Sequence, residues 1–293
     1  MSQKKKFGDR ADGRLIGKLD SMHAFMPYML PGRVANEAVM NELIDMTAVL
    51  EYLEKKNSDS PEFKYTIFHV ICAAVAKTIA KRPKLNYYIM NYRYYERNEV
   101  SLAFTVKKKF CDTSPEALAI LHLDPNSEES PIDLIYGKVK KIVYTVRKEN
   151  KNDGTTDIMD VIMKFPRCIV KIITALLFFL DNHNMLPKSI CKEDPYHCSV
   201  FLSNLGSIKT NASYHHLANW GTNSFFAIVG QMKMQPFYNE DGTFEMRNAL
   251  PLGLTIDERI ADGLYFVNSL KLLKKLLSEP ELLELPFNED IEY

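Results

Sequence analysis

The segment from Leu250 to Leu277 constrains the fold most, because it changes within a few residues from the period of a strand to the period of a helix. Its first half has apolar residues at alternate positions: Leu250, Leu252, Leu254 and Ile256. Its second half has apolar residues at spacings of four, three and four: Phe266, Leu270, Leu273 and Leu277. The first pattern predicts a strand and the second an amphipathic helix that begins near Gly263.

The rest of the chain alternates in the same way between helical and strand patterns. Helices are predicted over residues 61–82, where Pro83 follows, and from about Pro131 to Val146. Strands are predicted over four further segments: Val100–Val106, Ala117–Leu123, Cys198–Leu205 and Ser224–Gly230. A turn is predicted at Asn239–Gly242. This order of elements predicts a mixed α/β sandwich.

Composition restricts the partners of the chain. The 293 residues include 37 basic and 37 acidic side chains, so no overall field attracts nucleic acid or an anionic membrane. The five cysteines are irregularly spaced and form no C-x-x-C, and no His/Asp/Glu spacing resembles a metal site. We therefore expect no disulfide framework and no metal. The N-terminus lacks a secretory signal, which favours the cytoplasm.

An apolar stretch over residues 157–186 is predicted to form two helical pieces around Pro166. Its most apolar part, Cys168–Leu180, is 13 residues long and contains Lys171. A bilayer span needs about 20 residues, so we do not expect membrane insertion. The stretch is instead expected to be a buried helix or an apolar contact surface.

The turn between the last strand and the last helix carries four charged side chains: Asp257, Glu258, Arg259 and Asp262. Such a cluster at a strand-to-helix junction fits a functional site. It also fits a polar turn in which Asp262 accepts hydrogen bonds from the free N–H groups of the helix. The spacing alone favours the polar turn.

Two segments resemble motifs of a known family. The turn reads Asp257-Glu258-Arg259-Ile260-Ala261-Asp262-Gly263, and an earlier segment reads Ser203-Asn204-Leu205-Gly206. They resemble the D-H-R-x-x-D-G and S-N-L-G motifs in the catalytic domain of the acyltransferase components of 2-oxo acid dehydrogenase complexes, and more distantly chloramphenicol acetyltransferase. Two other segments are also similar to that family: Ser224–Gly230 and Pro83-Lys84-Leu85-Asn86.

The resemblance covers residues 15–285 and leaves residues 1–14 and 286–293 as tails. It implies a two-layer α/β sandwich of the chloramphenicol acetyltransferase type with a mixed sheet, assembled as a homotrimer that in some relatives forms a larger cage. From the sequence, we expect no lipoyl domain or peripheral-subunit-binding segment before this core. The stretch over residues 149–196 is longer than the usual connection of the family. Its apolar part is expected either to cover the substrate channel or to bind a protein partner.

The resemblance also implies a catalytic mechanism. In the family, a histidine takes the proton from the thiol of coenzyme A or dihydrolipoamide, and a serine hydroxyl of the neighbouring subunit stabilises the oxyanion. By position, Ser203 matches the serine, Asp262 matches a structural aspartate, and Glu258 replaces the histidine. The expected substrate-binding residues are Asn204, Arg259, His215 and His216. The two histidines also fit surface positions in a loop, and that alternative is favoured.

The replacement of histidine by Glu258 weakens the expected chemistry. A thiol titrates near 8.5, an imidazole near 6.5 and a carboxylate near 4.3. Proton transfer from a thiol to an unperturbed glutamate is uphill by roughly 6 kcal/mol, against about 3 kcal/mol for histidine. Two functions stay open: an atypical acyl transfer from acyl-coenzyme A to a small acceptor, and a catalytically inactive trimer that acts as a scaffold or binding protein.

Overall fold

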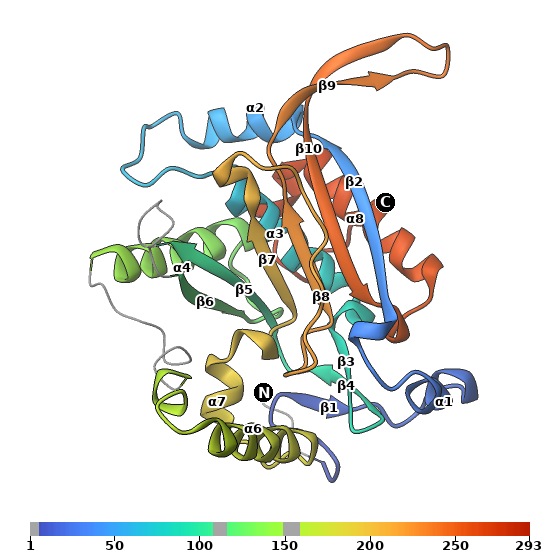
Figure 1. Ribbon diagram of the computed structural model, residues 1–293. Helices are drawn as coiled ribbons and strands as arrows, with labels where there is room; N and C mark the ends of the chain where they lie inside the picture. Colours follow the sequence, from blue (N-terminus) through green and yellow to red (C-terminus); the bar gives the residue numbers. More distant parts are fainter. Residues whose placement is uncertain (1–5, 108–115, 149–158) are drawn as a thin grey trace.

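The computed structural model describes residues 6–107, 116–148 and 159–293. Its centre is a sheet with the strand order β2-β10-β8-β7-β5-β6, to which β9 adds by pairing with β10 (Figure 1). Neighbours β5, β7 and β8 are parallel and the other pairs are antiparallel, so the sheet is mixed. The strands are β2 (Glu37–Asp45), β5 (Val100–Lys107), β6 (Glu116–Leu123), β7 (Val200–Asn204), β8 (Phe225–Val229), β9 (Lys233–Tyr238) and β10 (Phe244–Asp257).

Helices cover one face of this sheet. They are α2 (Thr47–Lys56), α3 (Ile67–Lys81), α4 (Pro131–Lys148) and α8 (Gly263–Ser278). Because side chains alternate along a strand, Leu102, Leu202 and Leu254 all point into the core beneath these helices and are fully or nearly fully buried. The predicted α/β sandwich with a mixed sheet is confirmed.

The opposite face of the sheet has a smaller apolar cluster. Its strand residues alternate along the strands with those that point into the main core: Ala103, Phe201, Phe226 and Ile228. The loop between β7 and β8 adds Leu217. This loop packs directly on the strands. A Cβ atom on Gly206 would lie 2.5 Å from the carbonyl oxygen of Gly230, so the glycine of the S-N-L-G segment is needed for close packing.

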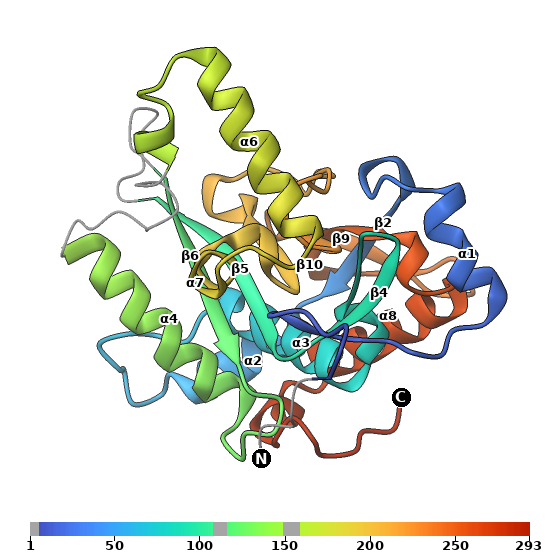
Figure 2. The same cartoon turned by 90° about the horizontal axis from the view of Figure 1, so that it is seen from below.

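A small sheet with the order β1-β4-β3 lies at one end of the main sheet (Figure 1). Its elements, with the adjoining helices, are β1 (Gly13–Leu15), α1 (Ser21–Met29), β3 (Tyr87–Met90), β4 (Arg93–Arg97), α6 (Arg167–Asn182) and α7 (Lys188–Glu193). Helix α6 projects from this end of the molecule (Figure 2).

Some described residues outside the bounds 15–285 also pack on the domain. Gly13 pairs with Arg97 in the small sheet, and Arg10 is 4% exposed. Phe287, near the C-terminus, belongs to the main core. Residues on both sides of the predicted bounds therefore contribute buried contacts.

The predicted elements differ from the observed ones at their ends, and several observed helices and strands were not predicted: β1, β2, β3, β4, β9, α1, α2 and α7. Helix α3 begins at Ile67 rather than at 61, because Thr66 and His69 form a capping box at its start. Pro166 separates the helical residues 159–162 from α6, as predicted. Among the described residues, no helix is long and apolar enough to cross a membrane.

Candidate functional site

The charged turn after β10 is fixed by a buried ion pair. Arg259 donates from Nε and Nη2 to the two carboxylate oxygens of Asp257, with both distances 2.7 Å. Its Nη1 donates to the carbonyl oxygen of Leu30 at 2.6 Å. Both charged side chains are almost completely buried. A forked pair of this geometry holds the backbone of the turn in one conformation.

The pair between Asp257 and Arg259 leaves Glu258 on the outside of the turn. Glu258 is exposed, and within the described chain its carboxylate makes no hydrogen bond or ion pair. Asp262 accepts from the backbone N–H of Tyr265 at 2.9 Å and caps α8; this hydrogen bond lowers the pKa of its carboxyl group. The predicted N-cap is confirmed, so Asp262 shapes the loop that carries Glu258.

Ser203 lies at the end of β7, on the face of the sheet away from the main helical layer. It is half-buried, and no hydrogen bond of its hydroxyl occurs within the described residues. Asn204 accepts from the N–H of Ser207 at 3.2 Å, and Ser207 donates its hydroxyl to the carbonyl oxygen of Asn204 at 2.7 Å. Asn204 therefore closes the turn after β7 without using the hydroxyl of Ser203.

The structure does not bring Glu258 and Ser203 together within one chain. Ser203 is opposite Ile228 on β8, which is opposite Gly253 on β10. Glu258 follows Gly253 by five residues, which corresponds to about 17 Å along the strand, and the two strand spacings add roughly 10 Å across the sheet. A site that uses both side chains therefore needs a second copy of the chain.

The two adjacent histidines lie in the loop between β7 and β8. The ring of His215 stacks on Phe226 with centroids 4.3 Å apart. His216 lies on the wall of a cavity of about 950 Å³ between this loop and residues 159–196, the described part of the long connection, which is called the insertion below. Phe178, Ile190 and Trp220 are on the same wall, which makes the cavity mostly apolar. Its volume is in the range of small-molecule sites.

Arg259, the remaining predicted substrate-binding residue, is 2% exposed. It lines a second cavity, of about 320 Å³, together with Arg33, Asn182 and His183. Burial lowers the pKa of Arg33 to about 10. The guanidinium of Arg259 is already occupied by Asp257 and Leu30, so in the single chain its contacts are structural.

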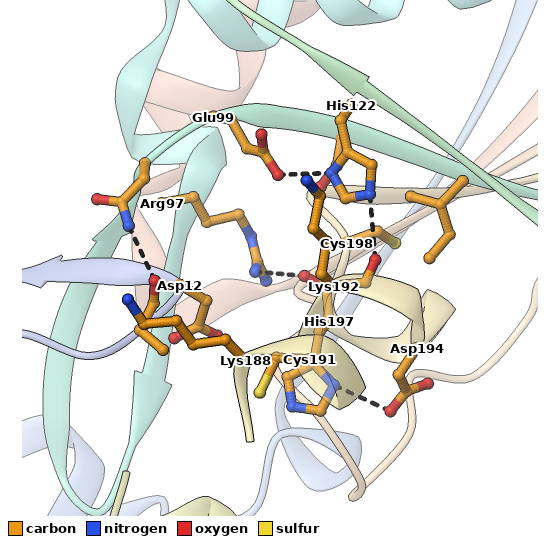
Figure 3. Close-up of a pocket in the computed structure, with 14 residues that line it drawn as sticks. Asp12, Arg97, Glu99, His122, Lys188, Cys191, Lys192, Asp194, His197 and Cys198 are labelled. Atoms are coloured by element: carbon orange, nitrogen blue, oxygen red, sulfur yellow. Dashed lines mark hydrogen bonds and ion pairs between the residues drawn. The ribbon is translucent and has the colours of Figure 1, made fainter. Parts of the chain in front are cut away.

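A third cavity, of about 240 Å³, lies where the insertion meets the N-terminal segment (Figure 3). The charged and polar groups at this junction come from distant parts of the chain, and all but the half-buried Asp12 are buried: Arg10, Asp12, Arg97, Asp181, Cys191, Asp194 and His197. No local pattern indicates this cluster, because its members are separated by up to 187 positions in the sequence.

The centre of the junction is His197, which lies between two carboxylates. Its Nδ1 is 2.9 Å from Asp194 Oδ2, and its Nε2 is 3.3 Å from Asp181 Oδ2. Burial alone would lower the pKa of His197, but the bonds to Asp181 and Asp194 raise it to about 9. Arg10 donates from Nη2 to Asp181 Oδ1 at 2.7 Å and so joins the N-terminal segment to α6.

Comparison with known proteins agrees with the motifs. Residues 188–285 match the family model of the 2-oxoacid dehydrogenases acyltransferase catalytic domain. The fold is similar to a probable dihydrolipoamide acetyltransferase from Listeria monocytogenes, with 16% identity, a TM-score of 0.58 and coverage of 94% of this chain and 96% of that chain. No curated protein matches the sequence.

Two further solved structures have the same fold. The cubic core of the pyruvate dehydrogenase multienzyme complex is 14% identical, with a TM-score of 0.58 and coverage of 97% of this chain and 95% of that chain. Chloramphenicol acetyltransferase is 13% identical, with a TM-score of 0.53 and coverage of 91% and 98%. Residues 188–285 thus match the catalytic domain of the 2-oxoacid dehydrogenase acyltransferases, and the chain as a whole has the fold of their cores and of chloramphenicol acetyltransferase.

Proposed function

We propose that the chain assembles as a homotrimer and transfers an acyl group from acyl-coenzyme A to a small acceptor at sites between its copies. The observation that carries the proposal is the placement of the two motif side chains. Glu258 and Ser203 are both free of partners within the described chain, yet they lie at opposite ends of the sheet. Head-to-tail contacts around a three-fold axis bring opposite ends of neighbouring copies together.

The surface of the single chain supports an assembly. The hairpin of β9 and β10 extends beyond the rest of the sheet (Figure 1) and carries four exposed apolar side chains: Met234, Tyr238, Phe244 and Met246. Exposed apolar groups on a protruding hairpin are typical of a surface that another chain covers.

In the proposed reaction, Glu258 of one copy accepts the proton of the acceptor while that acceptor attacks the acyl carbonyl. The hydroxyl of Ser203 from the neighbouring copy donates a hydrogen bond to the oxyanion. The carbon–sulfur bond of the tetrahedral intermediate then breaks, and Glu258 returns the proton to the sulfur of the departing coenzyme A. Exclusion of water at a contact between copies makes a carboxylate a stronger base than it is in bulk water. The apolar cavity beside His216 has room for the acyl chain.

One observation favours a second function, a trimer that binds or scaffolds without catalysis. A general base is normally oriented by a further group, and the carboxylate of Glu258 has no such partner within the described chain. In this alternative the outer face of α6 is the surface for a protein partner. Its exposed apolar residues form a stripe at helical spacing: Ile169, Ile172, Leu176 and Phe179.

The experiment that tests the catalytic proposal mixes two variants. Acyl transfer from acetyl-coenzyme A to thiols, amines and chloramphenicol is measured for wild type, Ser203→Ala and Glu258→Gln, and sedimentation gives the oligomeric state. We expect each variant to be an inactive trimer. When the two variants are unfolded and refolded together, about a quarter of the sites between copies regain both intact residues, so activity returns.

The outcomes separate the alternatives. A monomer in sedimentation, or failure of the mixed variants to regain activity when wild type refolds actively under the same conditions, contradicts a shared site. No turnover by wild type with any acceptor contradicts the catalytic proposal. Activity that appears in Glu258→His but is absent in wild type indicates a degenerate enzyme and supports the binding alternative.

A further inference from the structure

The junction of the insertion with the N-terminal segment contains a group of potential metal ligands that is unrelated to the turn and the serine. Asp181 comes from the end of α6, Cys191 from α7 and His197 from the segment before β7. All three residues are buried, and one ligand atom from each lies within 4.8 Å of the other two. Figure 3 shows Cys191 and His197 next to each other on the cavity wall.

The separation of two of the ligand atoms fits a shared tetrahedral ion as well as a direct hydrogen bond. Nε2 of His197 is 3.3 Å from Asp181 Oδ2, which is long for a bond between an imidazole and a carboxylate. Zinc binds nitrogen and oxygen at about 2.0–2.1 Å, and in a tetrahedron this places the two ligand atoms about 3.3 Å apart. The imidazole and the carboxylate therefore already have the separation that a shared zinc ion requires.

The hydrogen bonds behind His197 are of the kind found behind metal-binding histidines. Nδ1 of His197 is bonded to Asp194 Oδ2, which leaves Nε2 directed at Asp181. A carboxylate behind a histidine in this way fixes the ring and makes it a better ligand. Trp220 donates from its indole nitrogen to the same Asp194 oxygen and fixes the carboxylate in turn.

A further oxygen on the same cavity lacks a partner. Oδ2 of Asp12 is buried and has no hydrogen-bond partner within the described residues. Asp12, Cys191 and His197 all line the cavity. A buried carboxylate oxygen without a donor is costly, and an ion or a metal-bound water in the cavity would satisfy it.

We propose that Asp181, Cys191 and His197 bind one zinc ion, with Asp194 as the positioning residue behind His197 and the fourth coordination position facing the cavity that Asp12 lines. Mixed nitrogen, oxygen and sulfur ligands in tetrahedral geometry are those that zinc prefers. The ion connects α6, α7 and the segment before β7, so it fastens the insertion to the domain.

The test uses the full chain, stripped with a chelator and then loaded with Zn(II) or Co(II). We expect one zinc per chain in elemental analysis. We expect Co(II) to give the thiolate charge-transfer band and the strong visible bands of a tetrahedral site. The variant Cys191→Ser should lose the charge-transfer band. Cys198→Ser is the matched control, because Cys198 is a buried cysteine on the same cavity wall.

A substitution of Asp194 tests its role behind His197. Asp194→Asn is expected to weaken zinc binding by about 10–100-fold while leaving one site per chain. The proposal is overturned if the wild type binds no stoichiometric zinc, if bound Co(II) shows no thiolate band, or if Cys191→Ser binds as wild type does. Circular dichroism checks that each variant folds. If Cys191→Ser does not fold, X-ray absorption of the zinc-loaded wild type decides, since one sulfur ligand must be present.

Discussion

Two parts of the molecule bury charged side chains, and they do so in different ways. In the turn after β10, Asp257 and Arg259 are two residues apart and hold each other with a forked pair. At the junction of the insertion, Arg10 and Asp181 are 171 residues apart and are joined through a wider network. A local pair fixes the shape of one turn, whereas a long-range pair holds separate segments together. The consequences of breaking them should therefore differ in both size and extent.

The largest effect is expected for Arg259→Met. The substitution keeps the bulk of the side chain but leaves the Asp257 carboxylate buried without its partner, which costs about 3–5 kcal/mol of the free energy of unfolding. Urea denaturation of the whole chain measures the loss. Arg247→Met is the control, because Arg247 forms exposed ion pairs on the same strand, and we expect no measurable change there. Equal losses in both variants would contradict the role of the buried pair.

A smaller and more confined effect is expected for Arg10→Met. Asp181 then keeps His197 as a partner, so the loss is about 2–3 kcal/mol. Because the ion pair between Arg10 and Asp181 joins the N-terminal segment to α6, hydrogen exchange should increase over residues 167–197 while β10 and α8 stay protected. Arg14→Met, at an exposed position of the same segment, is the control. Increased exchange across the whole sheet would mean that the junction is not a separate unit.

The same contrast explains what the sequence could predict. Apolar patterns predicted β5, β6, β7, β8, the second half of β10 and the last helix, and Asp262 was predicted as a cap, because those signals lie within a few residues of each other. Strands β1, β2, β3, β4 and β9 were not predicted. The junction could not be predicted, since Arg10, Asp181 and His197 meet only after the chain has folded. The distance between Ser203 and Glu258 was equally hidden: it depends on the order β10-β8-β7, which no local pattern fixes.

The third prediction concerns Asp262, at the end of the turn. Asp262→Ala removes the acceptor for the N–H of Tyr265 at the start of α8, and we expect Tm to fall by about 2–4 °C. Asp262→Asn retains an acceptor oxygen and should lose less. Thermal unfolding followed by circular dichroism compares the two variants. A fall in Tm as large as that of Arg259→Met in the same thermal experiment would show that Asp262 does more than cap the helix.

The smallest effect on stability is expected at Glu258, the residue on which the proposed function depends most. Glu258 is exposed and has no partner within the described chain, so Glu258→Gln should leave Tm of a dissociated chain at high dilution within about 1 °C of wild type. In the proposed trimer the same residue faces a neighbour, so any effect of the substitution should appear only at concentrations where copies associate. Thermal scans over a range of protein concentrations measure this. An effect that does not depend on concentration would place the contacts of Glu258 within its own chain and would contradict a site shared between copies.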